Sequence, residues 1–132
     1  MTESVWRWVA MDVVLAIHDA QLAEHGGLQG VRDPTLVLSA LDRPRNLVNY
    51  ATPDIADLAA SYAFGLARNR GFIDGNKRTA FVVALVFLLD QGYALAASDG
   101  DAIAVMLAMA AGDMSEEALT TWFRAEIVAL PG

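Results

Sequence analysis

The stretch of residues 70–80 carries the residue types that could bind a phosphate-bearing ligand. It reads Arg-Gly-Phe-Ile-Asp-Gly-Asn-Lys-Arg-Thr-Ala and leads into an unbroken apolar run over residues 80–89. The first turn of a helix presents unpaired backbone N–H groups and a positive dipole end, which together favour anions. Gly75 allows a tight turn, and Lys77 and Arg78 add full positive charges beside those amides. Asp74 could bind a magnesium ion that bridges phosphate oxygens.

An ordinary structural role would explain the same residue types. Asp74 and Gly75 would form a turn, Asn76 would cap a helix, and Lys77 and Arg78 would only keep the helix end solvated. Residue types alone leave both interpretations open.

The charge distribution favours a small phosphate ligand over a nucleic acid. The net charge of -7 repels a phosphate backbone, so direct nucleic-acid binding is not expected. Four of the nine basic residues nevertheless fall within eleven positions: Arg68, Arg70, Lys77 and Arg78. Such a local cluster suits a small phosphate ligand, and a solvated basic patch is the alternative.

Length and composition predict one domain and no membrane span. A chain of 132 residues is long enough for a single compact core. The longest apolar runs have ten residues each, residues 80–89 among them, and are too short to cross a bilayer. The chain opens without a secretory leader and contains no cysteine, so we expect a cytoplasmic protein.

The hydrophobic spacing predicts an all-α fold, a compact helical bundle. Turn signals such as Gly26-Gly27, Asp33-Pro34 and Thr52-Pro53-Asp54 divide the chain into helical blocks. The predicted helices cover residues 10–24, 34–41, 54–68, 76–91, 101–111 and 115–129. The helix over 76–91 is expected to be the central, buried one, preceded by a loop over 69–75. Residues 5–9 could be extended, but no partner strand is identifiable.

The segment from Arg70 to Arg78 resembles the signature of the Fic/Doc family. That signature reads His-x-Phe-x-(Asp/Glu/Asn)-(Gly/Ala)-Asn-(Gly/Lys)-Arg, and six of its positions are filled by Phe72, Asp74, Gly75, Asn76, Lys77 and Arg78. Residues 17–19 and 24–34 resemble the N-terminal region of the Doc toxins within this family. The resemblance covers roughly residues 10–128, which makes coincidence a poor explanation.

Two positions point to the Doc branch. Family members that transfer AMP usually have glycine where this chain has Lys77, and a second arginine where it has Phe81. The Doc branch transfers the ATP γ-phosphate to a threonine of elongation factor Tu and so blocks translation. The resemblance implies ATP and Mg²⁺ as cofactors, with Asp74 serving the metal, Gly75 and Asn76 the loop and phosphates, and Lys77 and Arg78 the phosphate oxygens. Phe72 would anchor the loop in the core.

Arg70 departs from the pattern at its catalytic position. The family histidine accepts the proton of the target hydroxyl, and imidazole suits this because it titrates near neutrality. A guanidinium stays protonated at physiological pH and cannot replace it as a base. The chain is therefore predicted to be catalytically impaired. Arg70 could be a natural loss of catalysis, a disabling change that allowed a toxic protein to be produced, which we favour, or an extra phosphate clamp.

The two histidines and the partner surface complete the prediction. His18 and His25 match the N-terminal region of the family, and we expect packing or hydrogen-bonding roles for both. The resemblance implies a Phd-type antitoxin whose helix binds in a groove. Residues 10–22 and the region of Trp122 and Phe123 are candidates for that groove, with ordinary core as the alternative.

Two other functions stay open. The chain could be an AMP-transferring Fic-type enzyme, or a non-catalytic module that binds an antitoxin or a target without chemistry. ATP labelled at the α- or the γ-phosphate distinguishes the two enzymes, because the γ-label follows phosphate transfer and the α-label follows AMP transfer. An Arg70→His variant without toxicity or labelling would favour the binding module.

Overall fold

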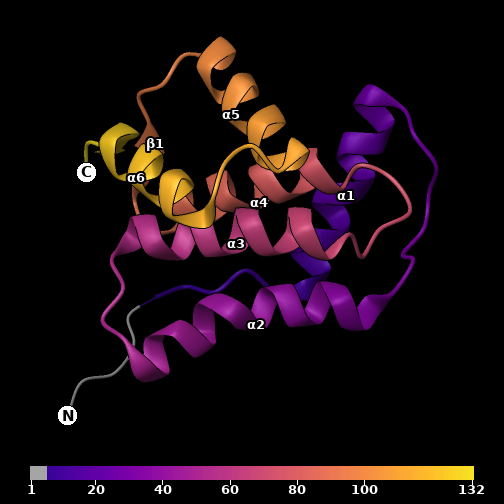
Figure 1. Cartoon of the computed structure of the whole chain (residues 1–132), viewed down its shortest axis with the longest axis horizontal. Coiled ribbons are helices and arrows are strands. Elements are labelled where there is room, and N and C mark those ends of the chain that lie inside the picture. The colour runs from indigo at the N-terminus through magenta and orange to yellow at the C-terminus, as the bar shows by residue number, and fades with distance from the viewer. Residues whose placement is uncertain (1–5) are drawn as a thin grey trace.

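The structure is a computed structural model that describes residues 6–132, and it confirms the predicted all-α fold (Figure 1). Six helices and one two-stranded sheet lie in this part of the chain. The helices are α1 (Met11–His25), α2 (Pro34–Tyr50), α3 (Ile55–Asn69), α4 (Asn76–Asp90), α5 (Asp99–Ala111) and α6 (Glu116–Glu126). The strands are β1 (Tyr93–Leu95) and β2 (Ile127–Ala129).

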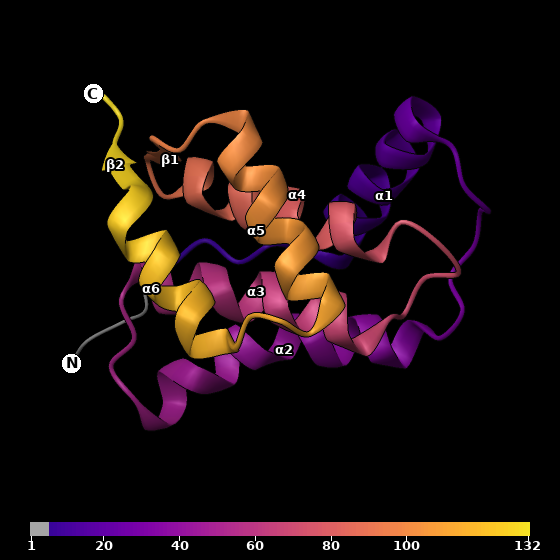
Figure 2. The same cartoon turned by 45° about the horizontal axis from the view of Figure 1, so that its top comes forward.

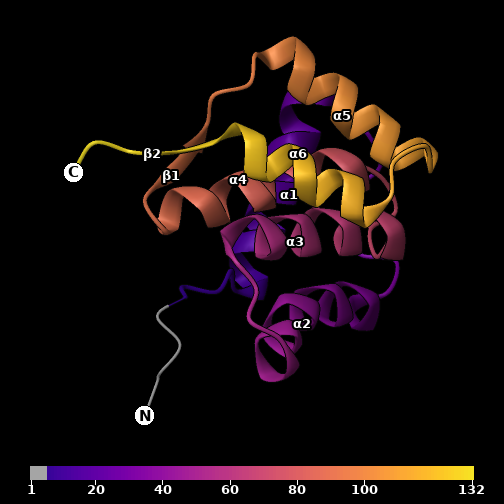
Figure 3. The ribbon, with the colours of Figure 1, turned by 60° about the vertical axis from the view of Figure 1, so that its left-hand side comes forward.

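Helices α3 and α4 form the centre of the fold. Helix α3 packs against α2, α4 and α6, with α2 on one side and α5 and α6 on the other (Figure 3). It is buried along more of its length than α4. The central position predicted for α4 alone is therefore shared by α3 and α4. Alanines and Gly65 let neighbouring helices approach α3 closely, while Tyr62 and Phe87 fill the space between α3 and α4.

Side-chain caps fix the starts of α2, α3 and α6 close to where the sequence predicts them. Asp33 caps α2, with Pro34 at its first position, and Ser115 caps α6. Asp54 and Asp57 form a capping box at the start of α3. Helix α5 begins at Asp99, two residues before its predicted start, because Ser98 caps it.

The predicted end of α2 at Leu41 is wrong, because the helix continues to Tyr50. Pro44 lies inside it and has no N–H to donate to the Ala40 carbonyl. Pro44 is buried, and Leu47 packs against the core one turn later. Tertiary packing therefore carries the helix past a residue that normally ends one.

The predicted end of the last helix at residue 129 is also wrong. Helix α6 stops at Glu126, and β2 pairs antiparallel with β1, a strand that the sequence prediction missed. The register places Tyr93 opposite Ala129. Residues 6–10 form no regular element, and Val5 lies outside the described residues. Within residues 6–132, none of the helices is both long and apolar enough to cross a membrane.

Candidate phosphate-binding site

The side chain of Asn76 closes the loop between α3 and α4. Its Oδ1 accepts a hydrogen bond from the Phe72 N–H at 3.0 Å, and its Nδ2 donates to the Phe72 carbonyl at 3.0 Å. Phe72 is 2% exposed and anchors this part of the loop in the core. Asn76 therefore holds the loop in one shape through the backbone of a buried residue.

His18 supports the loop from α1. Its ring is buried and stacks on Phe72 with the ring centroids 3.8 Å apart. Its Nε2 lies 2.8 Å from the carbonyl oxygen of Asp74, and because a carbonyl only accepts, Nε2 carries the hydrogen. His18 thus packs and hydrogen-bonds as predicted. At the end of α1, His25 Nε2 lies 3.9 Å from Glu24 Oε2.

The connection between α1 and α2, residues 26–33, lies along the loop (Figure 2) and forms hydrogen bonds with its backbone and with the Asp74 side chain. Sequence reasoning did not predict this contact. The bonds join Ile73 N–H to Gly30 O (3.1 Å), Asp33 N–H to Gly71 O (2.9 Å) and Leu28 N–H to the Asp74 carboxylate (3.2 Å). At Gly27, a Cβ would lie 3.0 Å from that carboxylate, so glycine permits the close approach.

Arg70 caps the C-terminus of α3 in the left-handed region, with φ 54° and ψ 48°. Its carbonyl accepts two hydrogen bonds from Arg32, from Nε at 3.0 Å and from Nη2 at 2.6 Å. Arg70 is exposed, so its side chain is available to a ligand. The structure therefore places residue 70 beside the start of α4, next to the other predicted site residues.

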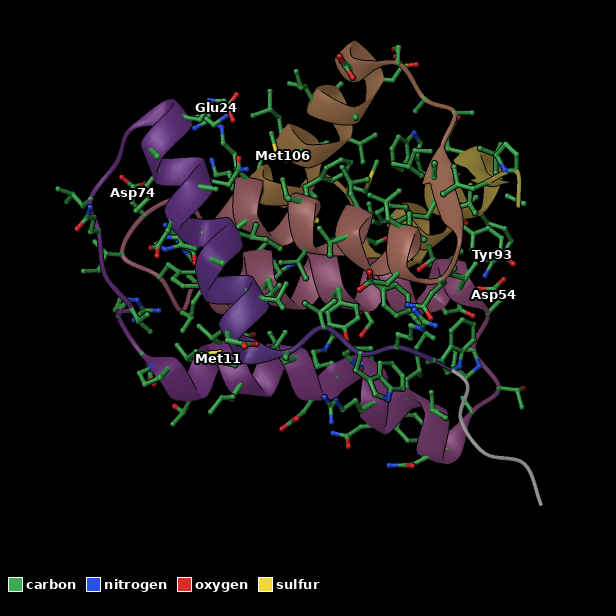
Figure 4. The ribbon with its side chains drawn as sticks, turned by 180° about the vertical axis from the view of Figure 1, so that it is seen from behind. Met11, Glu24, Asp54, Asp74, Tyr93 and Met106 are labelled. Carbon is green, nitrogen blue, oxygen red and sulfur yellow. The ribbon has the colours of Figure 1, made fainter. Side chains whose placement is uncertain are left out.

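A hollow of about 450 Å³ lies at the start of α4. The predicted site residues contribute most of its polar wall, and α5 contributes an apolar wall. The lining residues are Ala67, Arg68, Arg70, Ile73, Asp74, Gly75, Asn76, Lys77, Arg78, Met106, Leu107 and Ala110. Figure 4 shows Asp74 at the edge of the molecule and Met106 on α5. All the predicted site residues thus meet at one hollow.

The positive charge of this hollow is not neutralised by ion pairs within the described chain. Across residues 6–132, the side chains of Arg68, Arg70, Lys77 and Arg78 lie beyond 4.0 Å from every carboxylate oxygen. The Arg68 guanidinium instead lies over the Phe64 ring at 5.1 Å. The hollow is lined by these four cationic side chains and by one carboxylate, that of Asp74. Its net positive charge therefore suits an anionic ligand.

The backbone at the start of α4 adds to this preference. Its N-cap is Gly75, with φ 77°, and no side chain caps the helix. The Gly75 N–H donates to Asp74 Oδ1 at 3.0 Å, and the Thr79 N–H donates to the Gly75 carbonyl at 3.1 Å. The amides of the first turn are thus left to a ligand or to water.

Asp74 fits a magnesium ion only with phosphate as co-ligand. Each carboxylate oxygen accepts one backbone N–H, which leaves further lone pairs for a metal. Residues 6–132 contain no cluster of three or more His, Asp or Glu side chains that could hold a metal. Magnesium commonly binds through one or two carboxylates with substrate phosphates and water. The site is therefore compatible with a metal that arrives with a nucleotide.

A larger hollow of about 570 Å³ between α2, α3 and α6 is a weaker anion site. Its two arginines are already ion-paired. Arg43 lies 2.7 Å from Glu116, and Arg124 lies 2.7 Å from Asp54. The hollow at α4, whose cationic side chains are not ion-paired, is therefore the better candidate for an anion site.

A family model described as the Fic/DOC family matches residues 8–88. The chain belongs to this family. The match includes the loop and α4 as far as residue 88, but not α5 or α6, so it covers less than the predicted resemblance over residues 10–128.

Two relatives of this chain bear the name Doc. The chain is 36% identical to "Protein kinase doc" of Escherichia phage P1 over 87 residues, 65% of this chain and 69% of that protein. It is 45% identical to "Toxin Doc" of Mycolicibacterium smegmatis (strain ATCC 700084 / mc(2)155) over 74 residues, 54% of this chain and 57% of that protein. Both names agree with the predicted Doc branch.

Proposed function

We propose that this chain is the toxin of a toxin–antitoxin system, a Doc-type phosphotransferase that moves the ATP γ-phosphate to a threonine of elongation factor Tu. Membership of the Fic/DOC family and the names of the two relatives support the toxin and the kinase-like activity. The observation that carries the proposal is the hollow at α4, where four unpaired cationic side chains surround an uncapped helix start. We also propose a cytoplasmic location, where translation takes place.

Each side chain of the hollow has a separate role in this proposal. Lys77, Arg78 and the first amides of α4 bind the phosphate oxygens. Asp74 would hold the magnesium ion, which when bound neutralises charge on the phosphates. Asn76 keeps the loop in shape, and Phe72 anchors it. Phosphoryl transfer depends mainly on such positioning and charge stabilisation.

Arg70 lowers the activity of this chain in the proposal, because it occupies the position of the proton acceptor. A guanidinium cannot accept the threonine proton, and losing a general base typically lowers the rate by about 10² to 10⁴. Histidine is enriched in the left-handed backbone region among non-glycine residues, so the φ of 54° at position 70 can accept it. An Arg70→His variant should thus fit the existing backbone.

A Phd-type antitoxin is the proposed partner, with a helix that binds in a groove of this chain. Of the candidate residues, Phe123, Val14 and Leu22 are buried core. Trp122 is half-buried and Val13 is exposed. Only such outward positions of α1 and α6 are available to a partner helix.

A non-catalytic binding module is the second candidate, because Arg70 leaves the binding groups in place and removes the base. The test is to express the Arg70→His variant with its antitoxin, purify it, and incubate it with elongation factor Tu and ATP. Label from the γ-position on the factor supports the proposed kinase, and label from the α-position would show AMP transfer instead. If neither label appears on the factor and cells without antitoxin grow normally, the binding module is the function.

A further inference from the structure

The backbone at position 70 is unusual within the described chain. Every other residue of 6–132 with a positive φ is a glycine, and only Arg70 carries a side chain there. A side chain disfavours this region because its Cβ lies too close to the following carbonyl. Glycine would remove that strain, but it would present no side chain to the hollow. Backbone strain of this kind is often found where function needs it.

Arg32 binds the strained peptide directly. Its Nε and Nη2 donate to the same Arg70 carbonyl at 3.0 and 2.6 Å, and Nη2 also reaches the Asn69 carbonyl at 3.4 Å. Those carbonyls form the negative end of the α3 dipole, which favours a cation. In residues 6–132, Arg32 lies within 4.0 Å of no carboxylate oxygen. Its guanidinium therefore binds the carbonyl groups at the C-terminal end of α3.

The residues on either side of Arg70 are held by other contacts. The Asn69 side chain donates to the Leu36 carbonyl at 2.9 Å. The Gly71 carbonyl accepts from the Asp33 N–H at 2.9 Å, and a Cβ at Gly71 would clash with Val37 at 2.5 Å. The Arg70 carbonyl lies between these two fixed points. Arg32 is the partner that orients it.

We infer that Arg32 is a positioning residue: it holds residue 70 in the left-handed conformation and so directs the side chain at that position into the hollow. Arg32 is not among the residues that line the hollow, and its contact with residue 70 is to the backbone carbonyl. The kinetic consequence rests on the proposed function, whereas the conformational consequence does not.

The conformational test uses ¹⁵N,¹³C-labelled protein and the backbone chemical shifts and couplings of residue 70. In the unmodified chain these should report a left-handed residue. Arg32→Gln should move residue 70 out of that region, and Arg32→Lys should do so only in part, because one ammonium keeps a donor but loses the fork. Adding Arg70→Gly to Arg32→Gln should restore the loop shifts, since glycine adopts this region without strain. The matched control is Arg45→Gln, because Arg45 is an exposed arginine of α2 whose guanidinium lies over the Trp8 ring at 5.9 Å.

The kinetic test compares Arg70→His with Arg70→His/Arg32→Gln. The double variant should transfer phosphate about 10- to 100-fold more slowly, with its ATP dissociation constant unchanged, because misplacing one reacting group lowers kcat without removing phosphate ligands. Equal kcat values, or a residue 70 that stays left-handed in Arg32→Gln, would overturn the inference. If Arg70→His transfers no phosphate, the proposed function fails and the chemical shifts still decide the role of Arg32.

Discussion

Asn76 binds Phe72 with both ends of its side-chain amide, accepting from the N–H and donating to the carbonyl of the same residue at 3.0 Å each. This pairing joins the first residue of α4 to the middle of the preceding loop. This amide side chain is therefore one of the contacts that set the loop shape, and with it the positions of Asp74 and Lys77.

Asn76→Ala should lower the free energy of unfolding by about 1–3 kcal/mol, because two hydrogen bonds to the loop are lost. ATP binding should weaken as well, since the loop no longer presents its groups together. Urea denaturation and titration calorimetry measure the two effects. Asn49→Ala, on the exposed surface of α2, is the matched control. An Asn76→Ala protein with unchanged stability and affinity would contradict this role.

The unmodified chain should bind ATP with magnesium, because its phosphate ligands do not depend on a base at position 70. Lys77→Ala/Arg78→Ala should abolish that binding, and rising salt should weaken it in the unmodified chain. Calorimetry at several salt concentrations provides the measurement, with Arg45→Ala as control. Binding that survives the double change would place the nucleotide elsewhere.

His18→Phe should keep the ring against Phe72 and lose the hydrogen bond to the Asp74 carbonyl. The expected loss is about 1 kcal/mol, the usual net value of one such bond. His18→Ala should cost more, about 2–4 kcal/mol, because it also leaves a cavity in the core. Urea denaturation separates the two variants. Equal losses would mean that the hydrogen bond, rather than the ring packing, carries the whole effect.

Helix starts are the part of this fold that local sequence predicts best, because a cap such as Asp33, Asp54 or Ser115 acts on the next turn. The end of α2 depends on distant residues, since packing of Leu47 carries the helix beyond Pro44. The same holds for β2, which exists because β1 lies beside it. Periodicity cannot reveal either contact.

The grouping of the proposed site residues, Arg70 and 74–78, around one hollow was predictable because they are close together in the sequence. Their support was not, because Arg32 and Leu28 are about forty residues away in the chain. Arg32 was part of the resemblance to the Doc toxins, yet no local signal ties it to the carbonyl of residue 70. The contact forms because the folded chain places the α1–α2 connection beside the loop.

The pair of Asp54 and Arg124 should make stability depend on pH. A hydrogen bond from Arg124 lowers the pKa of Asp54 to about 2 from the ordinary 3.8. A lowered pKa in the folded state means that the pair stabilises the fold above about pH 4, and that this contribution is lost as the pH falls to about 2. Arg124→Ala should cost at most about 1 kcal/mol near neutral pH, because the pair is half-exposed.

Thermal melting of the unmodified chain and Arg124→Ala across that pH range tests this coupling. The two melting temperatures should converge as the pH falls from about 4 to about 2. Arg7→Ala, an exposed arginine outside the pair, should show a constant difference. A constant difference for Arg124→Ala would contradict the assignment.

The rate of phosphate transfer to elongation factor Tu, compared between the unmodified chain and Arg70→His, tests the central claim most directly. Both proteins should bind ATP, and Arg70→His should transfer the γ-phosphate about 10² to 10⁴ times faster, because only histidine can accept the threonine proton. Adding Asp74→Ala should abolish the transfer by removing the proposed magnesium ligand. Equal rates in the unmodified chain and Arg70→His would contradict the assignment of position 70 to the base.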